Sequence, residues 1–168
     1  MKHFTDIETL GLNPISDRII AIGVLNVEQD IPAILYGENE KQILTQFWNA
    51  VKNSDELLTF NGDGFDIPFI IVRSLINNVK ICENFNKIKI TDIRKVVNSF
   101  FISYNKFSKG TLRNWAEILG ITPETHNGGE MSELYLKKNW SEIKKHNEED
   151  LFILKQLYIR CINCGVLK

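Results

Sequence analysis

Residues 2–9 read Lys-His-Phe-Thr-Asp-Ile-Glu-Thr, and this stretch guides the interpretation of the rest of the chain. Its Phe, Thr and Ile residues are good strand formers, so the stretch predicts a β-strand. Side chains alternate between the two faces of a strand, which places Asp6 and Glu8 on the same face. Two neighbouring carboxylates repel each other unless a cation lies between them, and Mg²⁺ or Mn²⁺ prefers such oxygen ligands. An exposed strand edge with solvated charges is the alternative interpretation.

Four further strands are predicted from short apolar or β-branched runs at residues 18–27, 33–36, 56–60 and 88–92. Apolar residues at helical spacing predict helices at residues 39–53, 65–78, 111–119 and from 131 onward. Asn39 and Thr111 are candidate N-caps, and Gly120 closes the third helix. Three strands followed by strands and helices in alternation predict an α/β protein, with a mixed five-stranded sheet flanked by helices on both sides.

At 168 residues, with 43% hydrophobic and 24% charged side chains, the chain has the length and composition of one globular domain covering residues 1–168. No uninterrupted apolar stretch approaches the roughly 20 residues that a membrane span needs. The first residues lack the basic-then-apolar layout of a signal peptide, so we expect a cytoplasmic protein without a membrane partner. The three cysteines are an odd number and do not predict a disulfide framework.

Charge is distributed unevenly along the chain, although the net charge is only −1. Residues 1–70 carry 4 basic and 11 acidic side chains, whereas residues 71–113 carry 9 basic and 2 acidic ones. An acidic part that can hold metal is thus followed by a basic part that can meet a polyanion. A solvated lysine-rich surface is the alternative explanation.

A second candidate site begins at Asn61, where the sequence reads Asn-Gly-Asp-Gly-Phe-Asp-Ile-Pro-Phe-Ile. The two glycines flex the turn, and Asp66 then stands at the start of a predicted helix. Pro68 fits the first turn of that helix, where its missing N–H costs nothing. Asp66 has two interpretations, a carboxylate that caps the helix or a metal ligand, and Asp63 is interpreted as a loop residue that shapes the turn.

A third candidate site lies in the last predicted helix, where residues 144–151 read Lys-Lys-His-Asn-Glu-Glu-Asp-Leu. His146 and Asp150 are four residues apart, so their side chains lie on one face of the helix, one turn apart. A surface ion pair is the alternative interpretation of this pair.

Three short motifs therefore follow one another along the chain: Asp6-x-Glu8, Asn61-x-x-x-Phe65-Asp66 and His146-x-x-x-Asp150. In order, spacing and element type they resemble the three exonuclease motifs of the DEDD family of 3′–5′ exonucleases, which has a ribonuclease H-like fold. The second motif is most similar to the proofreading domain of family B DNA polymerases and related stand-alone predicted exonucleases. The resemblance spans roughly residues 3–160. One position departs from it, because the family usually has tyrosine four residues before the last aspartate, or histidine five before.

The resemblance implies two divalent metal ions, Mg²⁺ or Mn²⁺, held by four carboxylates: Asp6, Glu8, Asp66 and Asp150. Two such ions about 3.5–4 Å apart acidify the attacking water and stabilise the leaving oxyanion in phosphodiester cleavage. A histidine with an unperturbed pKa of about 6.5 can accept the proton of that water near neutrality, so we expect His146 to be the general base. A tyrosine, with a pKa of about 10, would mainly orient the water, and this second role stays open for His146. All five residues are expected to be catalytic.

The resulting hypothesis is a metal-dependent 3′–5′ exonuclease that releases nucleoside monophosphates from DNA or RNA. Its expected partner is nucleic acid with a free 3′ end, with single-stranded DNA as the first choice. A non-catalytic nucleic-acid-binding module on the same fold is one alternative, but pure binding gains nothing from clustering negative charge near phosphates. A ribonuclease H-type endonuclease is another alternative, and it would release internal fragments instead of mononucleotides.

Seven residues are expected to contact the nucleic acid: Thr9, Leu10, Asn61, Phe65, Lys106, Lys109 and Arg113. The basic residues of this region, with Lys89 and Arg94 nearby in the sequence, are expected to track the phosphates of the strand. Phe65, Tyr104 and Phe107 are available for base stacking, which tolerates any sequence. Phe65 also fits a core position.

Overall fold

The computed structural model describes residues 1–99, 110–124 and 131–168. Its elements follow one another as β1 (Lys2–Thr9), β2 (Ile19–Asn26), β3 (Ala33–Tyr36), α1 (Glu40–Val51), β4 (Glu56–Thr59), α2 (Asp66–Ile76), η1 (Phe85–Lys87), β5 (Lys89–Asp92), α3 (Ile93–Asn98), α4 (Leu112–Leu119), α5 (Met131–Leu136) and α6 (Trp140–Asn163). The five strands and the long helices predicted from the sequence are confirmed, with bounds that differ by a few residues.

The five strands form one mixed sheet in the order β3-β2-β1-β4-β5. β2 pairs antiparallel with both β1 and β3, whereas β1, β4 and β5 run parallel to one another. In the register between β1 and β2, Asp6 lies opposite Gly23 and Glu8 lies opposite Ala21. The register shifts between Glu8 and Thr9, at the end of β1. The three parallel strands therefore end along the same edge of the sheet, where the Asp6 and Glu8 carboxylates lie.

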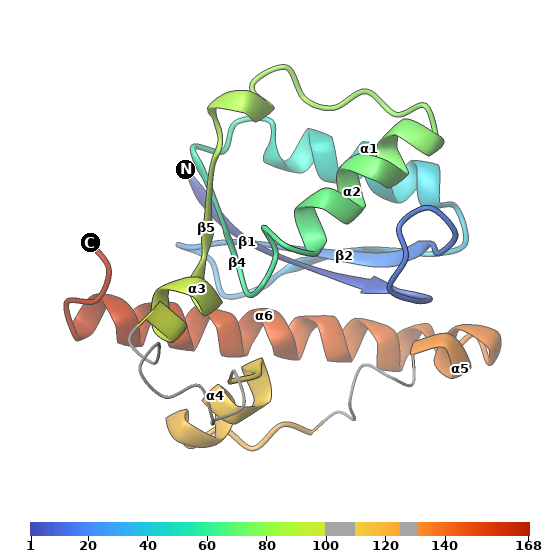
Figure 1. Cartoon of the computed structure of the whole chain (residues 1–168). Helices are drawn as coiled ribbons and strands as arrows, with labels where there is room; N and C mark the ends of the chain where they lie inside the picture. The colour runs from blue at the N-terminus through green and yellow to red at the C-terminus, as the bar shows by residue number, and fades with distance from the viewer. Residues whose placement is uncertain (100–109, 125–130) are drawn as a thin grey trace.

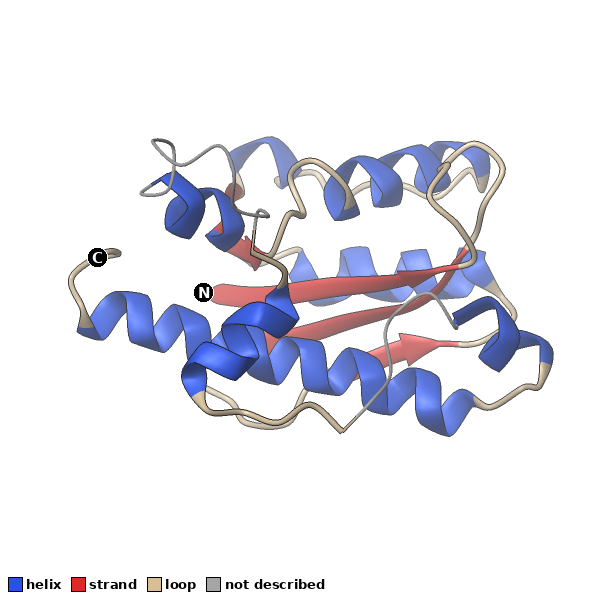
Figure 2. Cartoon of the chain, turned by 60° about the horizontal axis from the view of Figure 1, so that its bottom comes forward, coloured by secondary structure: helices blue, strands red, loops and turns tan. Residues whose placement is uncertain are grey.

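Helices cover both faces of the sheet, as Figures 1 and 2 show. On one face, α1 and α2 bury an apolar cluster against the strands, in which Leu44 and Phe47 are fully buried. On the other face, the long helix α6 crosses the sheet and packs Leu151 and Leu154 against Phe4 of β1. α4 packs against α6 (Figure 1). The predicted α/β architecture with helices on both sides of a mixed sheet is confirmed.

The predicted helix ends are explained by local hydrogen bonds. The side chain of Asn39 accepts from the backbone N–H of Gln42 at 3.1 Å and caps α1. Thr111 begins α4 through a capping box with Asn114. Gly120 ends α4 in the left-handed conformation, with φ of 75°, which glycine adopts without steric cost.

Two short helices, η1 and α3, are not predicted by the sequence patterns. α3 follows β5 directly because the Asp92 side chain accepts a hydrogen bond from the backbone N–H of Arg94 at 3.0 Å. Asp92 therefore ends a strand and caps a helix, and the strand pattern conceals the second role. Among the described residues, no helix is long and apolar enough to cross a membrane.

Candidate active site

β1 presents Asp6 and Glu8 toward α6. Phe4, two residues before Asp6, packs into the apolar cluster on the α6 side of the sheet. Because side chains alternate along a strand, Asp6 and Glu8 lie on the same side as Phe4. Glu8 is 5% exposed and Asp6 is half-buried, so neither carboxylate lies on a freely solvated edge.

α6 brings His146 and Asp150 to the end of β1. The Nδ1 atom of His146 lies 3.0 Å from Oε1 of Glu8 and 3.7 Å from Oδ2 of Asp150. The potential metal-ligand atoms of Glu8, His146 and Asp150 all lie within 4.8 Å of one another. The pair at spacing i, i+4 is therefore turned toward the sheet and is not a surface ion pair.

Asp66 is the first residue of α2 and is 5% exposed. It does not serve as the N-cap, which is Phe65 without a side-chain hydrogen bond. The backbone N–H groups of Asp66 itself and of Ile7 on β1 each act to lower the pKa of the Asp66 carboxylate. Asp6 interacts electrostatically with Asp66, Asp150 and Glu8, so carboxylates from three separate elements meet at the end of β1.

Burial and mutual repulsion disfavour the ionised forms of these carboxylates. Burial raises the pKa of Asp66 to about 7 and that of Asp150 to about 6. Burial, together with the charges of Asp66, Asp150 and Glu8, also raises the pKa of Asp6 well above its usual value. A carboxylate resists ionisation when it is desolvated next to like charges, and a bound cation relieves both effects.

The environment of His146 favours its protonated form. Burial of the ring would by itself lower the pKa, but the hydrogen bond and charge of Glu8 outweigh burial and raise the pKa of His146 to about 9. The metal-free chain therefore holds an imidazolium at neutral pH, ion-paired with Glu8. The other ring nitrogen, Nε2, is buried and has no hydrogen-bond partner among the described residues.

The donor set fits a hard divalent cation. The carboxylates of Asp6, Glu8, Asp66 and Asp150 offer oxygen ligands, which Mg²⁺ and Mn²⁺ prefer. Their raised pKa values show that the buried negative charge lacks sufficient compensation from the described residues around it. The tightest group contains Glu8, His146 and Asp150, whereas Asp6 and Asp66 lie beyond it.

One residue of the site is missed by the sequence analysis. Asn147 is fully buried, and its Nδ2 atom donates a hydrogen bond to Oδ2 of Asp6 at 2.7 Å. Asn147 follows His146 in a run of polar residues on a helix, and nothing in that local pattern distinguishes it from an exposed neighbour. The only sequence signal is non-local, since Gly23 on β2 leaves the space that Asn147 fills.

Four of the expected nucleic-acid contacts lie near the end of β1 or at the start of α2. The hydroxyl of Thr9 donates to the backbone oxygen of Gly11 at 2.6 Å, and Leu10 packs into a small apolar cluster. Asn61 is in the left-handed conformation, with φ of 69°, and accepts a hydrogen bond from Arg94. Phe65 is half-buried against Phe69, with ring centroids 5.4 Å apart.

The expected basic contacts are placed unevenly. Arg113, on α4, acts electrostatically on both His146 and Asp150, so α4 brings a positive charge to the site. Lys89 begins β5 at the opposite end of the sheet and pairs with Glu56 at 3.0 Å. Four other expected contacts lie outside the described residues: Tyr104, Lys106, Phe107 and Lys109.

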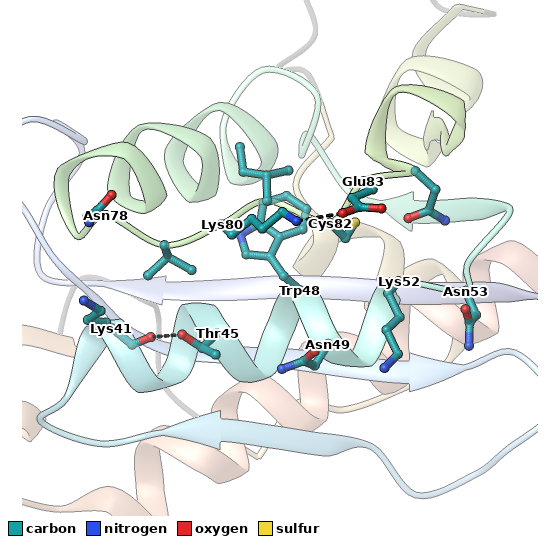
Figure 3. A pocket seen from close by; sticks show the side chains of 13 residues that line it. Lys41, Thr45, Trp48, Asn49, Lys52, Asn53, Asn78, Lys80, Cys82 and Glu83 are labelled. Atoms are coloured by element: carbon teal, nitrogen blue, oxygen red, sulfur yellow. Dashed lines mark hydrogen bonds and ion pairs between the residues drawn. The ribbon is translucent and has the colours of Figure 1, made fainter.

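A cavity of about 550 Å³ lies elsewhere, between α1 and the segment 78–84 after α2 (Figure 3). Lys41 and Lys52 line it from α1, and Lys80 pairs with Glu83 at 2.7 Å in the opposite wall. Trp48 also lines this cavity. None of the catalytic candidates lines it, so this cavity is separate from the carboxylate site.

The three motifs and the fold agree with a known family. A model of the RNase H superfamily matches residues 3–162, which include all three motifs. The chain belongs to the RNase H superfamily. The ribonuclease H-like fold expected from the motifs is thereby confirmed, and membership of this superfamily indicates a nuclease.

Known relatives include an uncharacterized protein of Methanocaldococcus jannaschii. The two sequences are 36% identical in an alignment that is 180 residues long. The alignment covers 99% of this chain and 98% of that protein. A stretch of 38 residues is 45% identical to DNA polymerase 1 of Sulfolobus acidocaldarius, covering 23% of this chain and 4% of the polymerase.

The fold of this RNase H superfamily member also occurs inside a larger enzyme. The structure of the family B DNA polymerase from Pyrobaculum calidifontis matches 98% of this chain with a TM-score of 0.82 and 15% sequence identity. The matched region is 25% of that polymerase chain, so this chain spans about a quarter of its length. The similarity to family B DNA polymerases expected from the second motif is confirmed at the level of the fold.

Proposed function

We propose that this protein is a metal-dependent 3′–5′ exonuclease of the DEDD type, formed by residues 1–168 as one domain. The observation that carries this proposal is the meeting of Asp6, Glu8, Asp66 and Asp150 with His146 at the end of β1. The four carboxylates come from three elements that are far apart in sequence, yet each element turns its carboxylate toward the same place. Such a cluster of buried like charges destabilises a fold unless it serves to bind cations.

The four carboxylates are the proposed ligands of two divalent ions, Mg²⁺ or Mn²⁺. When bound, such ions activate the attacking water and neutralise charge on the leaving oxygen of the phosphodiester. The protein itself holds these carboxylates partly shielded from water, where their electrostatic attraction to a cation is stronger than in bulk solvent. The burial of Glu8 and Asp66 serves this purpose.

His146 is the proposed general base, with a condition that the structure adds. An imidazolium cannot accept a proton, and the Glu8 contact keeps His146 protonated near neutral pH in the metal-free chain. His146 would become available as a base when Glu8 holds a cation, because the contact with Glu8 is what raises the pKa of the ring. Its proposed task is then to take the proton of the attacking water, while orienting that water remains the second candidate role.

The proposed substrate is nucleic acid with a free 3′ end, single-stranded DNA in the first place. Support comes from the polymerase relatives named above, which are DNA polymerases by name. Arg113 supplies a positive charge beside the carboxylates, which suits a phosphate backbone.

The test uses single-stranded DNA and RNA oligonucleotides labelled at the 5′ end, incubated with Mg²⁺, Mn²⁺ or EDTA. We expect the labelled strand to shorten one nucleotide at a time with metal and to stay intact with EDTA. A circular single strand should survive under the same conditions. Fragments cut from the circle would instead identify a ribonuclease H-type endonuclease. Binding without any cleavage would identify the non-catalytic module.

A further inference from the structure

Asn147 is the side chain outside the predicted site that is most closely tied to it. Its Nδ2 atom donates to Oδ2 of Asp6 at 2.7 Å, and the side chain is fully buried. Its Oδ1 atom is also buried, and no described residue forms a hydrogen bond with it. A buried amide oxygen without a partner is unfavourable, so stability alone would favour an apolar residue here. The donor end of the amide, directed at Asp6, explains why the position is polar.

The contact depends on a gap in the neighbouring strand. Gly23 pairs with Asp6 across β1 and β2. A Cβ atom added at Gly23 would lie 2.2 Å from Oδ1 of Asn147 and 2.5 Å from Cδ1 of Leu151. The absence of a side chain at Gly23 therefore lets α6 approach the sheet closely enough for Asn147 to reach Asp6.

We propose that Asn147 is a positioning residue that fixes the Asp6 carboxylate for a divalent cation, in space that Gly23 provides. The inference rests on the proposed function and deepens it. The hydrogen bond from Asn147 to Oδ2 restricts the rotation of the Asp6 carboxylate, which would then offer itself to a cation in a fixed orientation. An amide turned the other way would place two oxygens against each other, so the geometry itself selects the donor orientation. Partners of this kind typically change metal affinity 10–100-fold when they are removed.

The first test measures Mn²⁺ affinity by isothermal titration calorimetry, without nucleic acid. Asn147→Ala and Asn147→Leu should each bind Mn²⁺ about 10–100-fold more weakly than the wild-type chain. Asn147→Leu keeps a similar shape and removes the unpartnered oxygen, so its melting temperature should stay near or above that of the wild type. A matched control is Asn163→Ala, an exposed asparagine on the same helix, which should bind Mn²⁺ like the wild type.

The second test is a double-mutant cycle with Gly23→Ala. Its added methyl group should displace the Asn147 amide and weaken Mn²⁺ binding by a similar factor. In the Asn147→Ala background only the clash with Leu151 remains, so Gly23→Ala should weaken binding by a clearly smaller factor than in the wild-type background. An equal loss in both backgrounds would refute the link between Gly23 and Asn147.

The outcomes separate this inference from the proposed function. If Asn147→Ala and Asn147→Leu bind Mn²⁺ as tightly as the wild type, the positioning role is wrong while the exonuclease proposal stands. If the melting temperature of Asn147→Leu falls sharply and its Mn²⁺ affinity is unchanged, Asn147 is structural only. If the wild-type chain itself binds no Mn²⁺, both proposals fail.

Discussion

Buried carboxylates at the two ends of the parallel strands have pKa values shifted in opposite directions. At the edge where β1, β4 and β5 begin, Glu56 is 7% exposed and pairs with Lys2 and Lys89, each at 3.0 Å. Burial alone would raise its pKa, but hydrogen bonds from Thr91, Lys89 and Lys2 lower the pKa of Glu56 to about 2. At the edge where β1 ends, the equally buried Asp66 has a pKa raised to about 7.

The difference shows that burial raises the pKa of a carboxylate unless nearby cations and hydrogen-bond donors outweigh it. Glu56 is surrounded by cations and a hydroxyl donor, so its charge is compensated within the chain. At Asp66 the charges of Glu8 and Asp92 add to the effect of burial, and among the described residues no cation offsets them. The first arrangement is structural, and the second is what a cation site requires.

Substituting Asp66 should have the largest effect on the proposed nuclease activity. Asp66→Asn removes one proposed metal ligand, so nuclease activity should fall roughly 10³–10⁵-fold, as expected for several kcal/mol of lost charge stabilisation. The same variant should melt at a higher temperature than the wild type at pH 8 without metal, because a repelled buried charge is gone. Activity assays and thermal melts with EDTA check both parts. A variant that stays active would remove Asp66 from the site.

His146→Ala should have the next largest effect on activity. Loss of a positioned general base is expected to lower the rate roughly 10²–10⁴-fold, with Mn²⁺ affinity nearly unchanged. His146→Tyr separates the two candidate roles, since a water-orienting side chain would keep most of the activity and flatten the pH–rate profile. Rates measured between pH 5.5 and 9.5 at saturating Mn²⁺ make this comparison. A fully active alanine variant would exclude His146 from the mechanism.

The stability of the metal-free chain should decrease as the pH rises from about 4 to 9. Asp66 and Asp150 have folded pKa values of about 7 and 6, above the unfolded value near 4, so the folded state holds extra protons in that window. His146, at about 9 against 6.5 unfolded, continues the trend to higher pH. The loss should amount to several kcal/mol, because each pKa unit corresponds to about 1.4 kcal/mol and the shifts of interacting groups do not add in full.

Thermal melts of EDTA-treated protein at pH 5.5, 7 and 8.5 measure this loss. Mn²⁺ should raise the melting temperature more at pH 8.5 than at pH 5.5, because protonated carboxylates bind cations poorly. Asp66→Asn should flatten the dependence and serves as the control. If the metal-free chain were most stable at pH 8.5, the charges of Asp66 and Asp150 would already be neutralised by other groups of the protein.

The smallest effect on activity is expected at Glu56, whose charge is compensated by Lys2 and Lys89. Glu56→Gln exchanges charged hydrogen bonds for neutral ones and should lower the free energy of unfolding by about 1 kcal/mol. Its nuclease activity should remain within about twofold of the wild type, because Glu56 lies at the far end of the sheet. Urea denaturation and the oligonucleotide assay give the two numbers. If Glu56→Gln were instead more stable than the wild type, Glu56 would destabilise the fold just as Asp66 is expected to.

Most of the fold and the motif residues follow from local patterns in the sequence. Alternation in residues 2–9 places Asp6 and Glu8 on one face of a strand, and i, i+4 spacing places His146 and Asp150 together on a helix. Asn39 and Thr111 mark helix starts through hydrogen bonds within a few residues. These features need no knowledge of distant parts of the chain.

The features that sequence analysis misses depend on distant contacts. The burial of Asn147 is set by Gly23, more than a hundred residues away in the sequence. The protonation of His146 is likewise set by Glu8 on another element, so its ordinary pKa of about 6.5 does not apply in the metal-free chain. The residues that flank Asn147 and His146 in the sequence do not indicate these distant contacts.

The helix that forms one wall of the site is also the main support of the core. α6 holds His146 and Asp150 on successive turns, and the next turns bury Leu154 and Leu157 beneath the sheet. The wall cannot swing outward by itself, because doing so would expose those leucines to water. In native-state hydrogen exchange, the amides of residues 146–150 would therefore open only with the whole molecule. The positions of His146 and Asp150 therefore depend on the global stability of the fold.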